Sequence, residues 1–171
     1  MNTIRNFPCA LLALLTTSLA ALSVETNAIK LTAPQTHPGK LYADTCLSLS
    51  TRDFNTGTYA YGIGVGYQAS KHWGVDFRFS RDGLDAEGSA VQGIGGRLVA
   101  RMPFEFLSPY TFLGATFDLE RDQWRMQPGA GLEIGVSKKL KGLSVFTEGS
   151  LDADLNGRSG YVFGAGIRLR F

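Results

Sequence analysis

Residues capable of catalysis are few and widely separated in this sequence. The two histidines are His37 and His72, and neither lies close along the chain to an activated nucleophile. A hydrolase or acyltransferase needs a base within hydrogen-bonding reach of such a nucleophile. The candidates for a carboxylate-only catalyst are Asp118, Glu120, Asp152 and Asp154. No activated nucleophile accompanies them either, so we expect no catalytic residues and no cofactor. We also expect no metal ligands, because the mature chain has only two isolated histidines and one cysteine.

A larger set of ionisable residues follows a period of two along the chain. It consists of Asp44, Asp76, Arg78, Arg97, Arg101, Arg125, Glu133, Glu148, Arg168 and Arg170. The set contains arginine but no lysine, whereas a water-exposed face would normally mix lysine, glutamate, threonine and glutamine. Planar guanidinium groups form bidentate pairs with carboxylates. We therefore expect these residues to form a charge network inside an enclosed polar lumen.

The same alternation defines eight candidate strands. Their ranges are 41–54, 59–69, 73–81, 89–102, 109–119, 124–136, 143–155 and 160–171. Charged or turn-forming residues separate the ranges, and no helical apolar period occurs between them. Connections this short cannot cross over a sheet, so successive strands must be antiparallel neighbours. The sequence predicts an all-β fold, an eight-stranded antiparallel up-and-down β-barrel.

The strand face opposite the charges is apolar and carries aromatic residues near the strand ends. These aromatics are Tyr59, Tyr61, Trp73, Trp124, Tyr161 and Phe171. In an outer-membrane barrel the apolar side chains face lipid, and aromatic girdles mark the two interfaces. A soluble lipocalin-like barrel would reverse the faces and place the arginines and the mid-strand glycines in water. The pattern therefore predicts a transmembrane barrel.

Glycines recur in short motifs in every second candidate strand. The motifs begin at Gly62, Gly93, Gly129 and Gly164. A phosphate-binding or dinucleotide-binding loop needs a helix after its glycines, whereas another strand follows each motif here. The glycines lie on the polar face, so we expect them to leave room in a narrow barrel for the long charged side chains of neighbouring strands.

The first 40 residues differ from the rest of the chain. One early positive charge, an apolar run and small residues up to Ala28 predict a cleaved signal peptide over 1–28, with cleavage after Ala20 or Ala21 as the alternative. The prolines that follow predict a flexible periplasmic lead-in over 29–40, which leaves 41–171 for the barrel. Cys46 is then the only cysteine of the mature chain, so we expect no disulfide. The formal net charge of +2 is too balanced for nucleic-acid binding.

The last candidate strand alternates apolar residues up to a terminal aromatic. Its apolar face consists of Tyr161, Phe163, Ile167, Leu169 and Phe171. This ending, the even strand count and the placement of both termini at one end resemble the small outer-membrane barrels of the OmpA and OmpX type. The resemblance covers residues 41–171. It implies a Gram-negative outer membrane, periplasmic termini, contact with outer-membrane lipid and lipopolysaccharide, and a terminal aromatic that the barrel-assembly machinery reads.

We therefore expect a monomeric outer-membrane protein with a structural or surface-interaction role in the cell envelope, and not an enzyme. The main alternative is a narrow, porin-like channel for ions or small solutes, because eight strands enclose an interior just wide enough for side chains to fill. Weaker alternatives are a lipid-modifying outer-membrane enzyme and a soluble lipocalin-like binding barrel.

Overall fold

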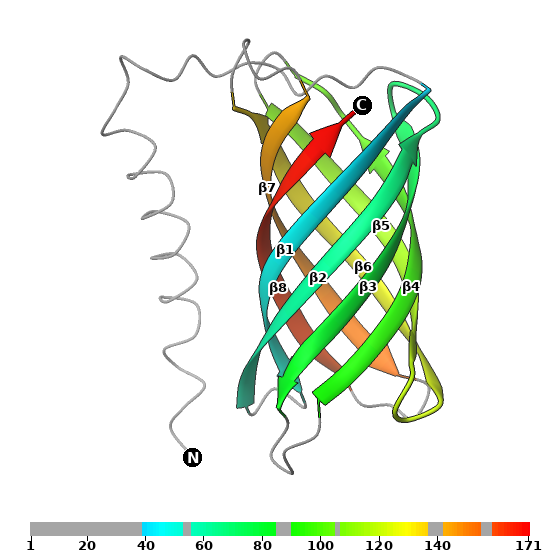
Figure 1. Cartoon of the computed structure of the whole chain (residues 1–171), viewed down its shortest axis with the longest axis vertical. Coiled ribbons are helices and arrows are strands. Elements are labelled where there is room, and N and C mark those ends of the chain that lie inside the picture. Colours follow the sequence, from blue (N-terminus) through cyan, green and yellow to red (C-terminus); the bar gives the residue numbers. More distant parts are fainter. Residues whose placement is uncertain (1–38, 53–55, 85–89, 105–106, 137–141, 155–158) are drawn as a thin grey trace, which may run out of the picture. The chain divides into compact units, whose positions relative to one another are not determined.

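Eight antiparallel strands in chain order form the structure, a computed structural model (Figure 1). It describes residues 39–52, 56–84, 90–104, 107–136, 142–154 and 159–171. The strands are β1 (Lys40–Arg52), β2 (Thr56–Gln68), β3 (Trp73–Leu84), β4 (Ala90–Arg101), β5 (Leu107–Asp118), β6 (Gln123–Gly135), β7 (Leu143–Asp154) and β8 (Ser159–Arg170). No helix in these ranges is long and apolar enough to cross a membrane. The predicted fold class is confirmed.

The strand boundaries differ from the predicted ones by a few residues. β2 begins at Thr56 and β5 at Leu107, inside segments that were predicted as breaks. β3 continues to Leu84, past the end of its apolar alternation, through an irregularity in its register with β4. Backbone pairing therefore extends into residues whose turn-forming side chains indicated loops. The predicted signal peptide and residues 29–38 of the lead-in lie outside the described residues.

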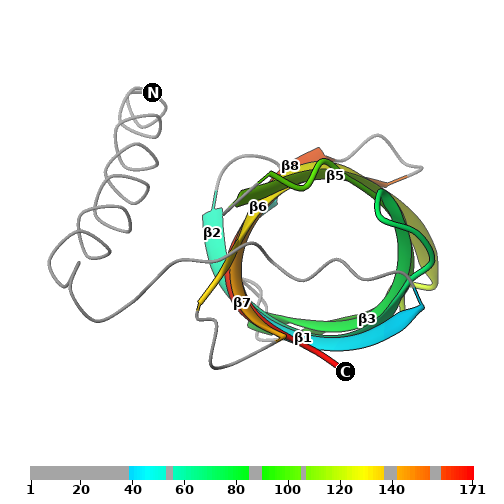
Figure 2. The same ribbon diagram turned by 90° about the horizontal axis from the view of Figure 1, so that it is seen from above.

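Pairing of β1 with β8 closes the sheet, as the view along the barrel shows (Figure 2). Directly paired residues can be followed once around the barrel, from one end of β1 to the other. The path is Ser50, Val162, Ser150, Gly129, Phe112, Val99, Gly74, Gln68 and Lys40. It returns to β1 ten residues from its start. This stagger requires strands that tilt steeply against the barrel axis, by about 35–45° in barrels of this kind.

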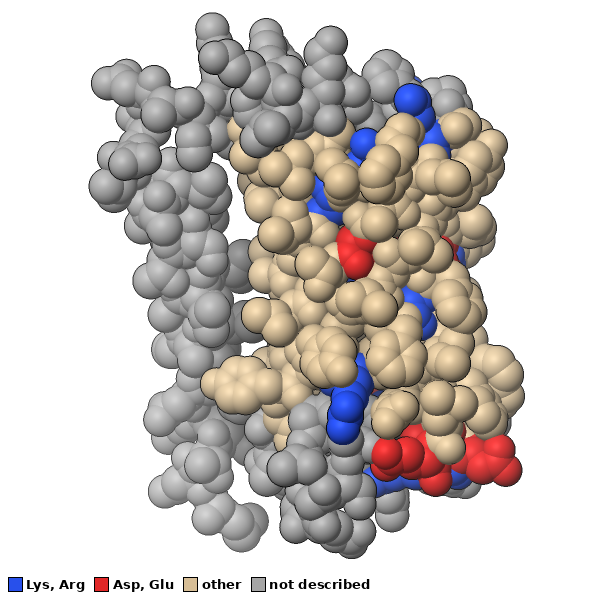
Figure 3. All heavy atoms as spheres, viewed as in Figure 1, with Lys and Arg blue, Asp and Glu red and all other residues tan. Residues whose placement is uncertain are grey.

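The two faces of the wall divide as the alternation predicts. The predicted girdle aromatics are all exposed on the outer surface, from Tyr59 at 83% to Tyr61 and Tyr161 at 45%. Tyr59 and Trp124 lie near the end where β1 meets β2, whereas Trp73 and Phe171 lie near the end that carries the C-terminus. Figure 3 shows a wall of mostly uncharged side chains, with acidic side chains gathered at the end away from the C-terminus. The end of the barrel that carries the C-terminus is its inner end, and the opposite end of the barrel is its outer end.

In the part of the chain that the structure describes, four aromatic side chains point into the lumen and are each paired across the sheet with a glycine. The pairs are Tyr42 with Gly66, Tyr110 with Gly131, Phe112 with Gly129, and Phe146 with Gly166. In each pair the ring covers its glycine, because a Cβ placed on the glycine would collide with the ring. Aromatic cover of strand glycines helps to fix register in barrels. The glycines thus leave room for aromatic rings as well as for charged groups such as Asp44, which lies against Gly64.

Substitution of Gly131 tests whether this glycine is needed because the Tyr110 ring covers it, or whether any strand glycine of the barrel is equally sensitive to substitution. A Cβ at Gly131 would lie 2.5 Å from the Thr147 carbonyl oxygen and 2.5 Å from the Tyr110 ring. We expect Gly131→Val to lower the free energy of unfolding by about 1–3 kcal/mol, the usual cost of overpacking. The measurement is urea unfolding in lipid vesicles, followed by tryptophan fluorescence.

Gly96→Val is the matched control. Gly96 is exposed on the outer face, and a Cβ there would meet nothing closer than 3.7 Å. Its unfolding midpoint should stay at or above that of the unchanged protein. Equal destabilisation by both substitutions would show that aromatic cover is not what the lumen glycines provide.

Candidate functional site

The inner end of the lumen is organised around one carboxylate, Glu133. Arg101 Nη1 lies 2.6 Å and Arg168 Nη1 2.7 Å from its Oε2. Arg170 Nη2 lies 2.5 Å from Oε1, to which the Ser144 hydroxyl also donates. The side chains of Glu133, Arg101 and Arg168 are completely buried. Three guanidinium groups therefore share one carboxylate in a water-poor site.

Arg168 connects this cluster to the middle of the lumen. Its Nη2 donates to Asp44 Oδ2 at 2.7 Å, and its Nε donates to the same oxygen at 3.1 Å. Asp44 also accepts hydrogen bonds from Arg78 Nη2 at 3.1 and 3.2 Å. Arg78 Nη1 in turn donates to Glu148. These contacts join β8, β1, β3 and β7 across the lumen.

Arg97 completes the central layer. Its Nε and Nη2 each donate to one oxygen of Asp76 at 2.8 Å, a bidentate pair, and its Nη1 donates to Glu148 at 3.0 Å. Two tyrosine hydroxyls accompany these carboxylates. Tyr110 donates to Glu148 at 2.9 Å, and Tyr42 donates to Asp76 at 3.3 Å. Nine of the ten predicted lumen charges thus belong to one connected network.

The tenth, Arg125, lies nearer the outer end, where it bridges two carboxylates. Its Nη1 donates to Asp152 Oδ2 at 2.6 Å and its Nη2 to Asp118 Oδ2 at 2.9 Å. Asp118 Oδ1 accepts the backbone N–H groups of Glu120 and Arg121 and so holds the β5–β6 turn. Asp118 and Asp152, two of the residues considered above for a carboxylate-only catalyst, therefore both serve as ion-pair partners of Arg125 in the lumen.

Lumen aromatics stack on the arginines of the network. The Arg97 guanidinium lies 4.4 Å from the centre of the Phe112 ring, and that of Arg168 lies 4.7 Å from both the Tyr42 and the Phe146 rings. Cation–π contacts of this kind stabilise guanidinium groups that have lost their water. The sequence interpretation missed these rings because it assigned aromatics to the lipid face. Their parity, together with a glycine in the neighbouring strand, is the signal that would have found them.

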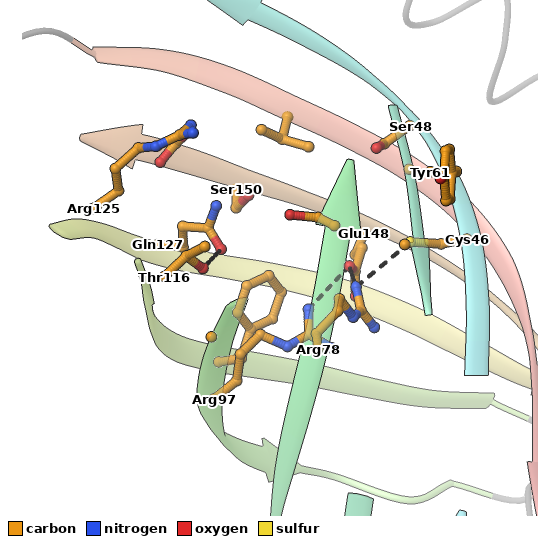
Figure 4. Close-up of a pocket in the computed structure, with 17 residues that line it drawn as sticks. Cys46, Ser48, Tyr61, Arg78, Arg97, Thr116, Arg125, Gln127, Glu148 and Ser150 are labelled. Carbon is orange, nitrogen blue, oxygen red and sulfur yellow. Dashed lines mark hydrogen bonds and ion pairs between the residues drawn. The ribbon is translucent and has the colours of Figure 1, made fainter. Parts of the chain in front are cut away.

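A cavity of about 60 Å³ lies between the central network and Arg125, and residues of all eight strands line it. Arg78, Arg97, Glu148 and Phe112 form its inner boundary. Figure 4 shows small polar side chains around it, among them Ser48, Ser150, Thr116 and Gln127. Cys46, a free buried thiol, also lines it, with its sulfur 3.7 Å from Arg78 Nη1.

The predicted assembly residues lie on the outer face of β8 and just beyond it. Tyr161, Ile167, Leu169 and Phe171 are exposed and Phe163 is half-buried. The Phe171 N–H donates to the Leu41 carbonyl at 2.9 Å and so extends the seam between β8 and β1 by one residue. The Phe171 side chain is 62% exposed.

Removal of the central inner carboxylate should destabilise the barrel strongly. We expect Glu133→Gln to lower the free energy of unfolding by about 3–5 kcal/mol, because Arg101, Arg168 and Arg170 would lose their shared counter-charge. Urea unfolding in lipid vesicles measures the change. The control is Glu120→Gln on the exposed outer turn, which should change stability by less than about 0.5 kcal/mol. A Glu133 variant as stable as this control would refute the role assigned to Glu133.

Comparison with known structures shows the same fold. A de novo designed transmembrane β-barrel aligns at a TM-score of 0.55 and 17% identity, covering 79% of this chain and 98% of the design. Neisserial surface protein A aligns at 0.54 and 13% identity, covering 77% and 96%. Ail, the attachment invasion locus protein of Yersinia pestis, aligns at 0.50 and 16% identity, covering 79% and 100%. At these identities the likeness concerns the fold alone.

Comparison with protein families is more specific. A search among curated proteins gives no match. The family model described as "Outer membrane protein beta-barrel domain" matches residues 9–171, nearly the whole chain. The chain therefore belongs to the outer membrane protein beta-barrel domain family and is an outer-membrane β-barrel protein.

Proposed function

We propose that this barrel has a structural and surface-interaction role in the envelope of a Gram-negative bacterium and neither catalyses a reaction nor conducts solutes. The observation that carries the proposal is the filling of the inner half of the lumen. The side chains that fill it are almost entirely inaccessible to solvent, between 0 and 2% exposed for Tyr42, Gln68, Val99, Arg101, Ser108, Glu133, Ser144, Phe146 and Arg168. Such a closely packed layer leaves no space for a continuous path of water molecules.

The positions of the reactive groups support the absence of catalysis. His72 lies in the turn before β3 at the inner end, where its Nδ1 is 3.1 Å from the Arg101 carbonyl oxygen. The serines that line the cavity, Ser48, Ser80 and Ser150, lie in the outer half of the lumen. Within the described residues, the imidazole and these hydroxyls are therefore separated by the whole charge network. Cys46 Sγ lies 3.7 Å from Arg78 Nη1, and among the described residues no histidine lines the cavity that contains this thiol.

The charge distribution supports an orientation with the inner end toward the periplasm. Lys40 and Lys71 are exposed at the inner end, where they can contact anionic phospholipid headgroups. Glu120 and Asp122 are exposed at the outer end. In this orientation the outward apolar residues contact outer-membrane lipid and lipopolysaccharide, and residues 1–28 serve as the cleaved export signal. The exposed wall needs no second protein subunit, because lipid covers it, so we propose a monomer.

A conductance measurement tests the closed lumen. Folded protein added to planar lipid bilayers should give no current steps, because the inner layer leaves no water-filled path. A sixteen-stranded porin serves as the positive control for insertion and detection. Reproducible ion-selective steps from the folded protein would favour the porin-like alternative and refute the proposed closure.

Substitution of the terminal aromatic tests the assembly signal. We propose that the barrel-assembly machinery reads the Phe171 side chain, which is 62% exposed at the seam between β8 and β1. Phe171→Ala should therefore leave the stability of protein refolded in vitro unchanged but reduce its heat-modifiable form in outer-membrane fractions several-fold. Phe104→Ala, in an equally exposed aromatic outside the last strand, should insert normally. Equal insertion of both variants would remove Phe171 from the signal.

A further inference from the structure

The outward face of β3 carries a charged residue, Arg81. It follows Trp73, Val75, Phe77 and Phe79 at every second position of the strand, so its side chain points away from the lumen, and it is exposed. At the outward positions of the described strands there is no other lysine, arginine, histidine, aspartate or glutamate. Among the described residues, none forms a hydrogen bond or ion pair with the Arg81 guanidinium. The wall therefore presents a cation to the membrane.

Arg81 lies at the level of the aromatic girdle of the outer end. It pairs directly with Tyr61 on β2. The stagger from Ser50 to Lys40 over eight strands places the β3 member of such a pair roughly one residue closer to the outer end. Arg81 is therefore between the levels of Tyr59 and Tyr61. Because girdle aromatics mark the boundary between hydrocarbon and headgroups, the guanidinium can extend to the headgroups at little cost.

Hydrogen-bond donors flank Arg81 on both neighbouring strands. Tyr61 is paired with it on β2 and Gln92 on β4, so these three outward residues form a row across the strands, called here the Arg81 row. The Cβ atoms of directly paired residues lie about 4.5–5.5 Å apart, which lets all three side chains reach one group. The exposed carboxylates of Glu120 and Asp122 lie farther toward the outer end, in the turn after β5. The row itself therefore favours an anion.

Phosphate is the anion that suits this row at this depth. A guanidinium donates to two phosphate oxygens at once, and the tyrosine hydroxyl and the glutamine amide can donate to the remaining oxygens. The next outward row toward the middle of the membrane is apolar and consists of Ile63, Phe79 and Ile94, which are directly paired. A phosphate above an apolar row is the arrangement that a lipid needs, because its headgroup is charged and its acyl chains are not.

We propose that the Arg81 row binds a phosphate of lipopolysaccharide, on the lipid A headgroup, while Ile63, Phe79 and Ile94 contact its acyl chains. The proposal deepens the contact with lipopolysaccharide proposed above and rests on the proposed orientation, in which the outer end lies in the leaflet that contains this lipid. Detergent micelles have no leaflets. Binding measured in micelles therefore tests the row separately from the orientation and from the structural role.

The experiment is a titration of the folded full-length protein with bisphosphorylated lipid A in micelles that contain phosphatidylglycerol, with bound lipid counted by native mass spectrometry. Arg81→Gln should weaken binding about tenfold, because the charged hydrogen bonds to phosphate are lost. Tyr61→Phe, which removes one neutral donor, should weaken it about two- to fivefold. The heat-modifiable band shows that each variant is folded. Binding by Arg81→Gln as tight as that of the unchanged protein would overturn the site.

Lys71→Gln is the matched control, because it removes the same charge from an exposed side chain at the inner end. Phosphatidylglycerol in the micelles occupies the contact of Lys71 with phospholipid headgroups, so this variant should change lipid A binding less than twofold. Equal weakening by Lys71→Gln and Arg81→Gln would show a general attraction between a basic protein and an anionic lipid, and would overturn the Arg81 row as the site.

Two further ligands test the lipid and its phosphate separately. Dephosphorylated lipid A with the same acyl chains should bind at least about fivefold more weakly, and Arg81→Gln should not weaken it further, since the interaction that this variant loses is already absent. Inorganic phosphate at the concentration of lipid A should not displace it, because a free ion lacks the contacts with the apolar row. Equal binding of the two forms of lipid A would refute phosphate recognition. Displacement by equimolar inorganic phosphate would refute a lipid as the ligand.

Discussion

Charge compensation across a closed lumen is the constraint on which the rest of this structure depends. Once β1 pairs with β8, arginines and carboxylates are enclosed in a space too narrow for each to keep its own water. Each carboxylate therefore compensates more than one arginine: Glu133 contacts three arginines, and Asp44 and Glu148 contact two each. Arginine is suited to this role because its planar fork can donate to different carboxylates at once.

The contribution of β2 shows how such a network fits inside eight strands. Between Ala60 and Gln68, every inward position of β2 is a glycine, namely Gly62, Gly64 and Gly66. Cys46, Asp44 and Tyr42 on β1 lie over these three glycines. Arg78 on β3 can therefore reach across β2 to bind Asp44 on β1. The inner face of β2 carries no charged residue between Ala60 and Gln68. It therefore leaves space for charged side chains of β1 and β3 to meet over it.

The sequence predicted the fold well because period-two alternation is a direct consequence of a wall with one apolar and one polar face. It also indicated which charges face inward, since parity alone decides that. It could not indicate partners, because Arg78 and Glu148 lie 70 residues apart and meet only when the barrel closes with its particular stagger. The inward aromatics escaped prediction for a related reason: Phe112 and Phe146 look like lipid-facing residues until their glycine partners in the next strand are known.

The geometry of the network suggests that its value lies in register more than in stability. Buried ion pairs often contribute little net free energy compared with apolar packing of similar volume. However, several of these pairs join strands that are not neighbours, as when Arg97 on β4 meets Glu148 on β7. A slip of one residue would turn the charges toward lipid, and a slip of two would keep the faces but move paired groups about 7 Å apart. Among barrels with correctly oriented faces, charge compensation therefore favours the one stagger observed.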